Sequence, residues 1–257
     1  MMRKISSVAC AVAAVTLTMT VPVAAQRSAT GPIEIPLRVE DGRLLVTAES
    51  TDGRTFDFVL GVGMPLLTES GAARLEDAGE SLTLGGIPVA VDGAQTVPDA
   101  YLSGSAAVGV LGGATLNRFD VLIDAPNGRL LLKPAARAVR WDGVALSGPV
   151  RLQVFHDVLL RADVEFGGTL VGGLIDLARP EHQVGDALSP AVQDGAVGTF
   201  RVGYGSWSDA PAVIVDNRVF RGWDPEGTGF VFVGAALAHD CAIAISWYHA
   251  ELRTCTR

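Results

Sequence analysis

Residues 58–65 read FVLGVGMP, and residues 173–180 read GLIDLARP. Each stretch is an apolar run that leads into a turn, the first at Gly61 and the second at Asp176. A short apolar run bounded by turn residues is typical of a buried β-strand. The two stretches look like copies of one piece of protein, a strand followed by a sharp loop, and they predict an internally repeated β-fold.

The sequence around these two stretches repeats in the same order. Short strand-like runs precede each stretch, and an apolar run, a glycine, a short helix and a hairpin follow it. Three landmark pairs in the later part are each 122 positions apart: Gly112 and Gly234, Ile123 and Ile245, Leu130 and Leu252. Gly61 and Asp176 are 115 positions apart. We infer an internal duplication of about 115 residues, with about seven residues gained in the second copy.

Helical periodicity is scarce. Residues 69–78 and 114–118, and residues 235–239 in the second copy, suggest short helices. Elsewhere, short alternating or apolar runs are separated by Gly, Pro, Asp and Asn, which is the pattern of an all-β protein. The expected parts of the mature chain are residues 31–134, a linker at residues 135–148, and residues 149–257.

The first 25 residues have the composition of a secretory signal peptide. Arg3 and Lys4 precede an apolar run at residues 8–23, and residues 23–25 (VAA) form a cleavage site before Gln26. A membrane anchor is the alternative, but the run is short for a bilayer span and contains three Thr. We expect an exported protein, periplasmic or secreted, without a membrane span once the signal is removed.

The chain is acidic, with 20 Lys and Arg against 28 Asp and Glu. Its net charge of −8 becomes −10 when the signal peptide, with its two cations, is removed. Binding to phosphates requires a basic surface, so nucleic acids and anionic membranes are disfavoured as partners.

The mature chain has two cysteines, Cys241 and Cys255, since Cys10 leaves with the signal peptide. In an exported protein such a pair predicts one disulfide, here across a hairpin centred on Tyr248. A redox or metal role is the other interpretation, but no further thiol and no His cluster accompanies the pair. The four His have no metal-ligand spacing, and we predict neither a metal nor another cofactor.

At these landmarks the chain resembles the pepsin/retropepsin superfamily, in particular the lobes of bacterial retropepsin-like aspartyl proteases. Residues 56–65 resemble the family's catalytic strand and loop, and residues 109–112 with 123–130 resemble its later glycine and hairpin. The resemblance covers residues 33–134 well and residues 149–255 more loosely. It implies a bilobal aspartic-protease-like fold, two β-barrel lobes with a cleft between them. Because both lobes lie on one chain, it also implies a monomer.

The family's chemistry needs two aspartates that share one proton, one in each loop. Here Gly61 replaces the first Asp, and Val62 replaces the hydroxyl residue after it. The second loop keeps Asp176, but Leu177 and Ala178 replace its hydroxyl residue and glycine. Asp176 is therefore either a vestigial catalytic acid or a structural acid that pairs with Arg179 or caps the turn.

Other acids are poor substitutes for the missing one. The side chain of Asp57 points to the other face of its strand, because successive side chains of a strand alternate between faces. Glu69 begins a helix, where its charge suits the N-terminus. Asp124 matches a structural Asp of the family's hairpin. His182 follows Asp176 by six residues, and we expect it at the surface rather than in catalysis. Tyr204 and Trp207 belong to a flap-like hairpin and either line the cleft or pack on the sheet edge.

The predicted binding residues of the cleft are Gly61, Gly63, Asp176, Tyr204 and Trp207. The leading hypothesis is a non-catalytic exported protein, a pseudoenzyme, whose cleft binds a peptide or protein segment. The alternative is an active aspartic endopeptidase, which requires a second carboxylate within about 4 Å of Asp176. A third hypothesis is a structural β-protein in which side chains fill the space between Gly63 and Asp176.

Overall fold

The computed structural model describes residues 31–78, 81–136, 140–227 and 229–255, and the predicted signal peptide lies outside them. Residues 31–257 form one compact unit. Strands account for 48% of the residues and helices for 16%, which confirms the all-β prediction. Within the described residues, no helix has the length and apolar character needed to cross a bilayer.

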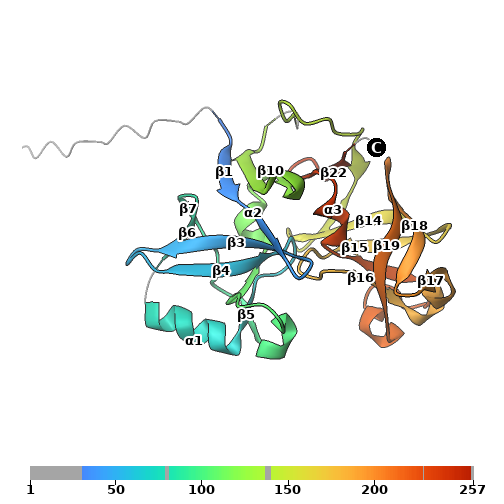
Figure 1. Ribbon diagram of the computed structural model, residues 1–257, viewed down its shortest axis with the longest axis horizontal. Coiled ribbons are helices and arrows are strands. Elements are labelled where there is room, and N and C mark those ends of the chain that lie inside the picture. Colours follow the sequence, from blue (N-terminus) through green and yellow to red (C-terminus); the bar gives the residue numbers. More distant parts are fainter. Residues whose placement is uncertain (1–30, 79–80, 137–139, 228, 256–257) are drawn as a thin grey trace, which may run out of the picture. The chain divides into compact units, whose positions relative to one another are not determined.

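The first half forms an eight-stranded sheet in the order β7-β6-β3-β4-β9-β5-β8, with β2 paired to β3 (Figure 1). Its strands are β2 (Arg38–Glu40), β3 (Arg43–Ser50), β4 (Thr55–Leu60), β5 (Leu66–Thr68), β6 (Leu82–Leu84), β7 (Ile87–Pro88), β8 (Gln95–Val97) and β9 (Gly109–Leu111). Helix α1 (Glu69–Ala78) has the predicted bounds and begins with Glu69, whose charge suits the helix N-terminus. The 3-10 helix η1 (Asp99–Leu102) and helix α2 (Gly113–Leu116) flank β9 in the sequence.

The second half forms another eight-stranded sheet, in the order β13-β14-β15-β20-β16-β19-β18-β17. Its strands are β13 (Gln153–Phe155), β14 (Leu159–Phe166), β15 (Thr169–Ile175), β16 (His182–Gly185), β17 (Val192–Gln193), β18 (Ala196–Val202), β19 (Gly205–Val215) and β20 (Phe230–Val233). Its short helices are η3 (Asp186–Ala191), η4 (Asn217–Phe220) and α3 (Ala236–His239). An additional pairing of β14 with β18 closes six of the strands into a barrel.

Both halves contain the same arrangement of three strands, which we call the crossing because a loop crosses the end of the central strand. In the first half, β9 runs parallel to β4 on one side and antiparallel to β5 on the other. In the second half, β20 has the same relation to β15 and β16. The loop that leaves β4, and the loop that leaves β15, must each pass over the end of the central strand to reach its far side.

The halves differ in how the sheet closes. Strand β19 is continuous, and it pairs with β18 through residues 205–211 and with β16 through residues 212–215 (Figure 1). In the first half the corresponding run is broken into β7 and β8, with residues 89–94 between them. Pro88 ends β7, and Pro cannot donate a ladder hydrogen bond, so the first half remains an open half-barrel.

A third sheet joins the halves in the order β1-β11-β10-β21-β22-β12. Its strands are β1 (Ile33–Pro36), β10 (Phe119–Asp124), β11 (Arg129–Pro134), β12 (Val150–Arg151), β21 (Ile243–Ser246) and β22 (Glu251–Thr254). Leu122 of β10 lies directly opposite Ala244 of β21, and the two are 122 positions apart. Equivalent residues of the two copies therefore meet at the centre of this sheet, as a two-fold relation between the halves requires.

Each half ends in the same hairpin. Gly128, after the 3-10 helix η2 (Ala125–Asn127), adopts a left-handed φ of 65°, and its carbonyl accepts a 2.9 Å bond from the Leu37 amide. Ala250 holds the equivalent place with φ 49°, and its carbonyl accepts a 2.8 Å bond from the Leu152 amide. A left-handed conformation costs less at Gly than at Ala, so the second copy retains the turn in a more strained form.

Two hydrogen bonds, which we call the reciprocal clasp, tie a turn of each half to a short helix of the other. His239 Nε2 donates to the Gly42 carbonyl at 2.9 Å. Asn117 Nδ2 donates to the Asp157 carbonyl at 3.4 Å. Asn117 and His239 are 122 positions apart, and Gly42 and Asp157 are 115 apart, so the two bonds follow the sequence repeat on both sides.

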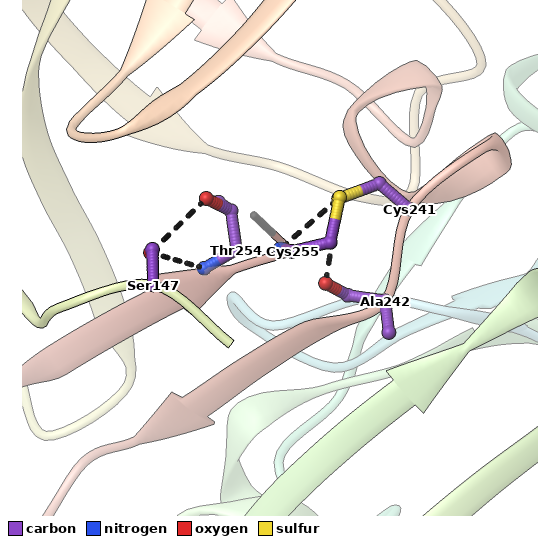
Figure 2. The surroundings of a disulfide bond; sticks show 5 residues. All are labelled: Ser147, Cys241, Ala242, Thr254 and Cys255. Carbon is purple, nitrogen blue, oxygen red and sulfur yellow. Dashed lines mark hydrogen bonds between the residues drawn. A yellow bond between two sulfur atoms is a disulfide. The ribbon is translucent and has the colours of Figure 1, made fainter. Parts of the chain in front are cut away.

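The predicted disulfide is confirmed. Figure 2 shows Cys241 and Cys255, whose sulfurs are bonded and whose Cα atoms are 5.6 Å apart. Beside them, the Thr254 amide donates to the Ser147 hydroxyl at 3.3 Å (Figure 2). The bridge fastens the end of β22 to the residues just before β21, and the Thr254–Ser147 bond fastens the same strand to the chain that enters the second half.

Candidate functional site

The two loops identified from the sequence occupy equivalent backbone positions. The Gly61 amide donates to the Leu111 carbonyl at 2.8 Å, immediately after β4. The Asp176 amide donates to the Val233 carbonyl at 2.9 Å, immediately after β15. Each residue is thus the first one past a strand that runs parallel to the central strand of its crossing.

The loops diverge after this point. Leu66 pairs with Val110, and Gln183 pairs with Phe232, which lies 122 positions after Val110. The loop at residues 61–65 therefore corresponds to the loop at residues 176–182, and the second loop is two residues longer. The Gly63 carbonyl accepts from the Gly113 amide at 2.7 Å, and the equivalent acceptor is the Arg179 carbonyl, not that of Ala178. The sequence predicted that Ala178 stands at the position of the loop's glycine, whereas by these hydrogen bonds Arg179 is the residue that corresponds to Gly63.

Asp176 forms an ion pair within its own loop. Arg179 Nε donates to its Oδ2 at 2.7 Å, and the Asp176 side chain is 22% exposed. The Arg179 guanidinium lies 5.0 Å from the ring centre of Phe232 and 5.9 Å from that of Tyr101. Two aromatic rings and a carboxylate thus hold the cation, and the cation in turn neutralises the acid with which the loop begins.

Opposite Asp176, the first loop offers no polar side chain. A Cβ placed on Gly61 would lie 2.5 Å from Cγ1 of Val110 and 3.8 Å from Cβ of Ala178. The two loops therefore approach one another closely at Gly61, and the space that a first-loop side chain would need is already filled. The residues that follow the first position of each loop are Val62 and Leu177, which are fully buried and carry no hydroxyl.

A pocket of about 150 Å³ lies between the two loops. Gly61, Gly63 and Asp176 line it, as predicted for the cleft, and the remaining lining side chains are mainly aliphatic: Met64, Leu66, Val110, Leu159, Leu174, Ile175 and Ala178, together with Tyr101. Among the described residues that line this pocket, Asp176 is the only acid. The second carboxylate that an aspartic dyad needs is not in this set.

Tyr101 and Met64 are among the pocket residues that the sequence did not predict. They are 36% and 43% exposed, and they place an apolar edge at the pocket. Burial raises the pKa of the Tyr101 phenol, and the nearby Asp176 carboxylate raises it further. Tyr101 comes from η1, far from either loop in sequence, so the pattern around Gly61 held no signal for it.

Tyr204 and Trp207 do not line this pocket. Tyr204, at the β18–β19 turn, is 72% exposed, and its ring approaches Gly148. Trp207 is buried, with its ring centre 5.8 Å from that of Phe200. The prediction that both aromatics belong to one cleft with Gly61 and Asp176 is corrected: Trp207 packs in the core of the second half instead.

His182 is also placed differently from the prediction. It is buried rather than at the surface, and its ring lies 4.1 Å from that of Phe200. Its Nδ1 accepts a 3.1 Å bond from the Gly234 amide, so the proton of the neutral ring is on Nε2. Burial lowers the pKa of His182 to about 3, with a smaller contribution from His239. The neutral imidazole supports the crossing of β20 and β16.

The acids that were set aside as dyad substitutes lie elsewhere. Asp57 accepts from the Thr47 hydroxyl at 2.6 Å and pairs with Arg38 at 2.9 Å. Asp124 is buried and pairs with Arg129 Nε at 2.8 Å. Among the described residues, no group of three or more His, Cys, Asp or Glu side chains has the arrangement of a metal site.

Comparison of the chain with protein-family models and with curated proteins finds no match.

Proposed function

We propose that this chain is an exported, non-catalytic protein with a bilobal aspartic-protease-like architecture, and that the pocket between its two loops binds a peptide segment. The paired carboxylate and guanidinium of Asp176 and Arg179 carry this proposal. An acid that already has a cationic partner, with no second acid among the residues that line the pocket, lacks the neighbouring carboxylate that the dyad mechanism uses.

Two features support the architecture. The crossing of three strands occurs once in each half, and the reciprocal clasp follows the sequence repeat on both sides. Duplicated lobes joined by a shared sheet account for both. With both lobes on one chain, a second copy is not needed to complete the pocket, and we propose a monomer.

The size of the pocket supports a peptide side chain as the occupant. A volume of about 150 Å³ accommodates roughly one apolar side chain or a molecule the size of benzene. Met64 and Tyr101 then flank the incoming segment. The space between Gly63 and Asp176 also argues against the purely structural alternative, in which side chains would fill it.

The catalytic test uses the mature chain with a mixture of fluorogenic peptides, over about pH 3 to 6, where a carboxylate dyad works. We expect no cleavage above the buffer blank, and no difference between the wild type and Asp176→Asn. Cleavage that pepstatin inhibits and that Asp176→Asn abolishes, with the variant still folded by circular dichroism, would establish the endopeptidase instead.

The binding test uses fluorescein-labelled Gly/Ser decapeptides that carry a single central Leu or Phe, measured by fluorescence polarisation. Tyr101→Ser should weaken binding by roughly fivefold to tenfold, because it removes an apolar wall of the pocket. Tyr248→Ser is the matched control, since Tyr248 is an exposed tyrosine that is absent from the pocket lining. Equal affinities of the two variants, or no binding by any peptide, would contradict peptide binding at this pocket.

A further inference from the structure

A second pocket, of about 280 Å³, lies in the second half of the molecule and shares no lining residue with the pocket between the loops. It is formed by the neighbouring strands β14 and β15 together with the chain between η4 and β20. Arg161 and Asp163 contribute charges of opposite sign, and Leu170, Trp223 and Phe230 contribute apolar surface.

Arg161 is a half-buried cation without a counter-ion among the residues that the structure describes. Its guanidinium lies 5.6 Å from the ring centre of Phe230 and passes over Gly172, where a Cβ would be only 2.8 Å from Nη2. Its side chain makes no hydrogen bond or ion pair with any described residue. A guanidinium has five N–H donors in a planar fork that fits a carboxylate, so these unused donors favour an anionic group in the pocket.

Asp163 supplies the opposite charge on the same strand. It lies two residues after Arg161, so both side chains leave the same face of β14, about 6–7 Å apart along the strand. The Asp163 carboxylate has no ion-pair partner among the described residues either. The third charged group of the pocket, Asp224, accepts from the Gly229 amide at 2.8 Å and so serves its own loop.

The aromatic rings on the apolar side of the pocket pack against one another. The rings of Trp223 and Phe230 are stacked at 6.4 Å, and Phe155 meets Trp223 edge-on at 5.8 Å. Leu170 is 72% exposed at the same pocket. An exposed leucine beside packed aromatic rings is a suitable surface for an aliphatic or aromatic side chain.

We propose that this pocket binds a free α-amino acid with an apolar or aromatic side chain. The α-carboxylate lies against the Arg161 guanidinium, the α-ammonium against the Asp163 carboxylate, and the side chain against Trp223 and Leu170. A zwitterion satisfies both unpaired charges at once, whereas a simple anion would meet two acids in an already acidic protein. This binding is independent of the function proposed for the pocket between the loops.

The test is isothermal titration calorimetry of the mature chain with L-phenylalanine and L-leucine. We expect saturable binding of both. N-acetyl-L-phenylalanine lacks the ammonium and L-phenylalaninamide lacks the carboxylate, and each should bind tenfold or more weakly, because one charged contact is lost. Glucose is the probe for a sugar site, and binding of glucose in preference to the amino acids would overturn the proposal.

Variants assign the binding to this pocket. Arg161→Met and Asp163→Asn should each weaken phenylalanine binding tenfold or more, and Gly172→Ala should weaken it by displacing the guanidinium without removing its charge. Arg201→Met is the matched control, because Arg201 is ion-paired with Glu165 and lines a different pocket. Unchanged affinity in folded Arg161→Met, or no binding of any common amino acid at about 10 mM, would refute the proposal.

Discussion

The loops that begin at Gly61 and Asp176 share their backbone hydrogen bonds to the central strand but differ in their side chains. Both begin with an amide bonded to the last residue of a central strand, and both cross to the far side of that strand. The first loop is short and apolar, whereas the second is two residues longer and contains an ion pair. The comparison separates what the crossing requires, which is backbone geometry, from what catalysis requires, which is a pair of acids.

The same separation holds elsewhere in the two halves. The reciprocal clasp uses an amide side chain in one half and an imidazole in the other, and each donates to a backbone carbonyl. Each end hairpin has one left-handed residue at the same place, Gly128 in the first half and Ala250 in the second. Because main-chain carbonyls and amides are present at every position, a duplicated fold can keep these contacts while the side chains change.

The largest loss of stability is expected at Gly234 and Gly112, two glycines of the crossings that have no space for a side chain. A Cβ on Gly234 would lie 2.1 Å from the Glu181 carbonyl oxygen, and a Cβ on Gly112 would lie 2.5 Å from the Pro65 nitrogen. Because these are backbone atoms, Gly234→Ala and Gly112→Ala should each lower the free energy of unfolding by about 3 kcal/mol or more. Urea denaturation measures this.

The control for these two variants is Gly198→Ala, because a Cβ at Gly198 meets nothing within 4 Å. It should change stability by no more than about 0.5 kcal/mol. If one crossing glycine tolerated alanine as well as Gly198 does, the two crossings would not be equivalent in packing.

The next prediction concerns the pH dependence of stability, to which the crossing of the second half contributes and that of the first half does not. His182 titrates in the crossing of the second half, while Pro65, its counterpart by strand register, cannot. Burial lowers the pKa of His182 from 6.5 to about 3, so between these values the unfolded chain binds a proton that the folded chain does not. Stability should therefore fall as the pH drops below 6.5, by about 3 kcal/mol from this residue between pH 7 and pH 4.

His182→Gln removes this titration and checks the assignment. Urea denaturation at a series of pH values should give a shallower loss of stability on acidification for the variant than for the wild type, whatever the stability at neutral pH. Parallel curves for the two proteins would show that His182 does not dominate the acid response.

A smaller effect tests the reciprocal clasp. The bond from His239 is 2.9 Å and partly buried, whereas the bond from Asn117 is 3.4 Å and exposed. His239→Ala should cost about 1 kcal/mol, and Asn117→Ala less than about 0.5 kcal/mol, because shorter and less hydrated bonds contribute more. Thermal unfolding followed by circular dichroism gives both values. An equal or larger loss of stability in Asn117→Ala would contradict the prediction that the shorter His239 bond contributes more than the Asn117 bond.

Changes in stability of similar size test the end hairpins. Ala250→Gly should raise the free energy of unfolding by about 0.5–1 kcal/mol, because glycine relieves the left-handed strain. Gly128→Ala should lower it by about 1 kcal/mol for the same reason. Both are measurable as shifts of the urea midpoint. Opposite signs in the two halves are the expected result, and a loss of stability in Ala250→Gly would contradict it.

Much of the fold could be predicted because its signals are local. Helix α1 was predicted at its observed bounds from residues 69–78, and the strand at residues 55–60 was predicted as observed. The Cys241–Cys255 bridge followed from two cysteines near a hairpin. Each of these depends on neighbours in sequence, where periodicity, turn residues and spacing are directly visible.

The predictions that failed concerned burial. His182 and Trp207 were judged by sequence neighbours, yet both are buried against Phe200, which belongs to another strand. The pocket residue Tyr101 was missed because η1 folds back from about 40 residues past Gly61. Such contacts depend on which strands are adjacent, and no local pattern specifies that.

The sequence by itself determined the all-β class, the repeated order of strands and loops, and the absence of an aspartate at position 61, because these follow from residue identity and spacing. Only the tertiary structure decided that Val110 fills the space beside Gly61 and that Arg179 neutralises Asp176. It also decided that Arg161 and Asp163 line one pocket and have no ion-pair partner among the described residues. These facts require distances between side chains that lie on different elements or are oriented by them. Packing sets those distances, and packing is a property of the whole folded chain.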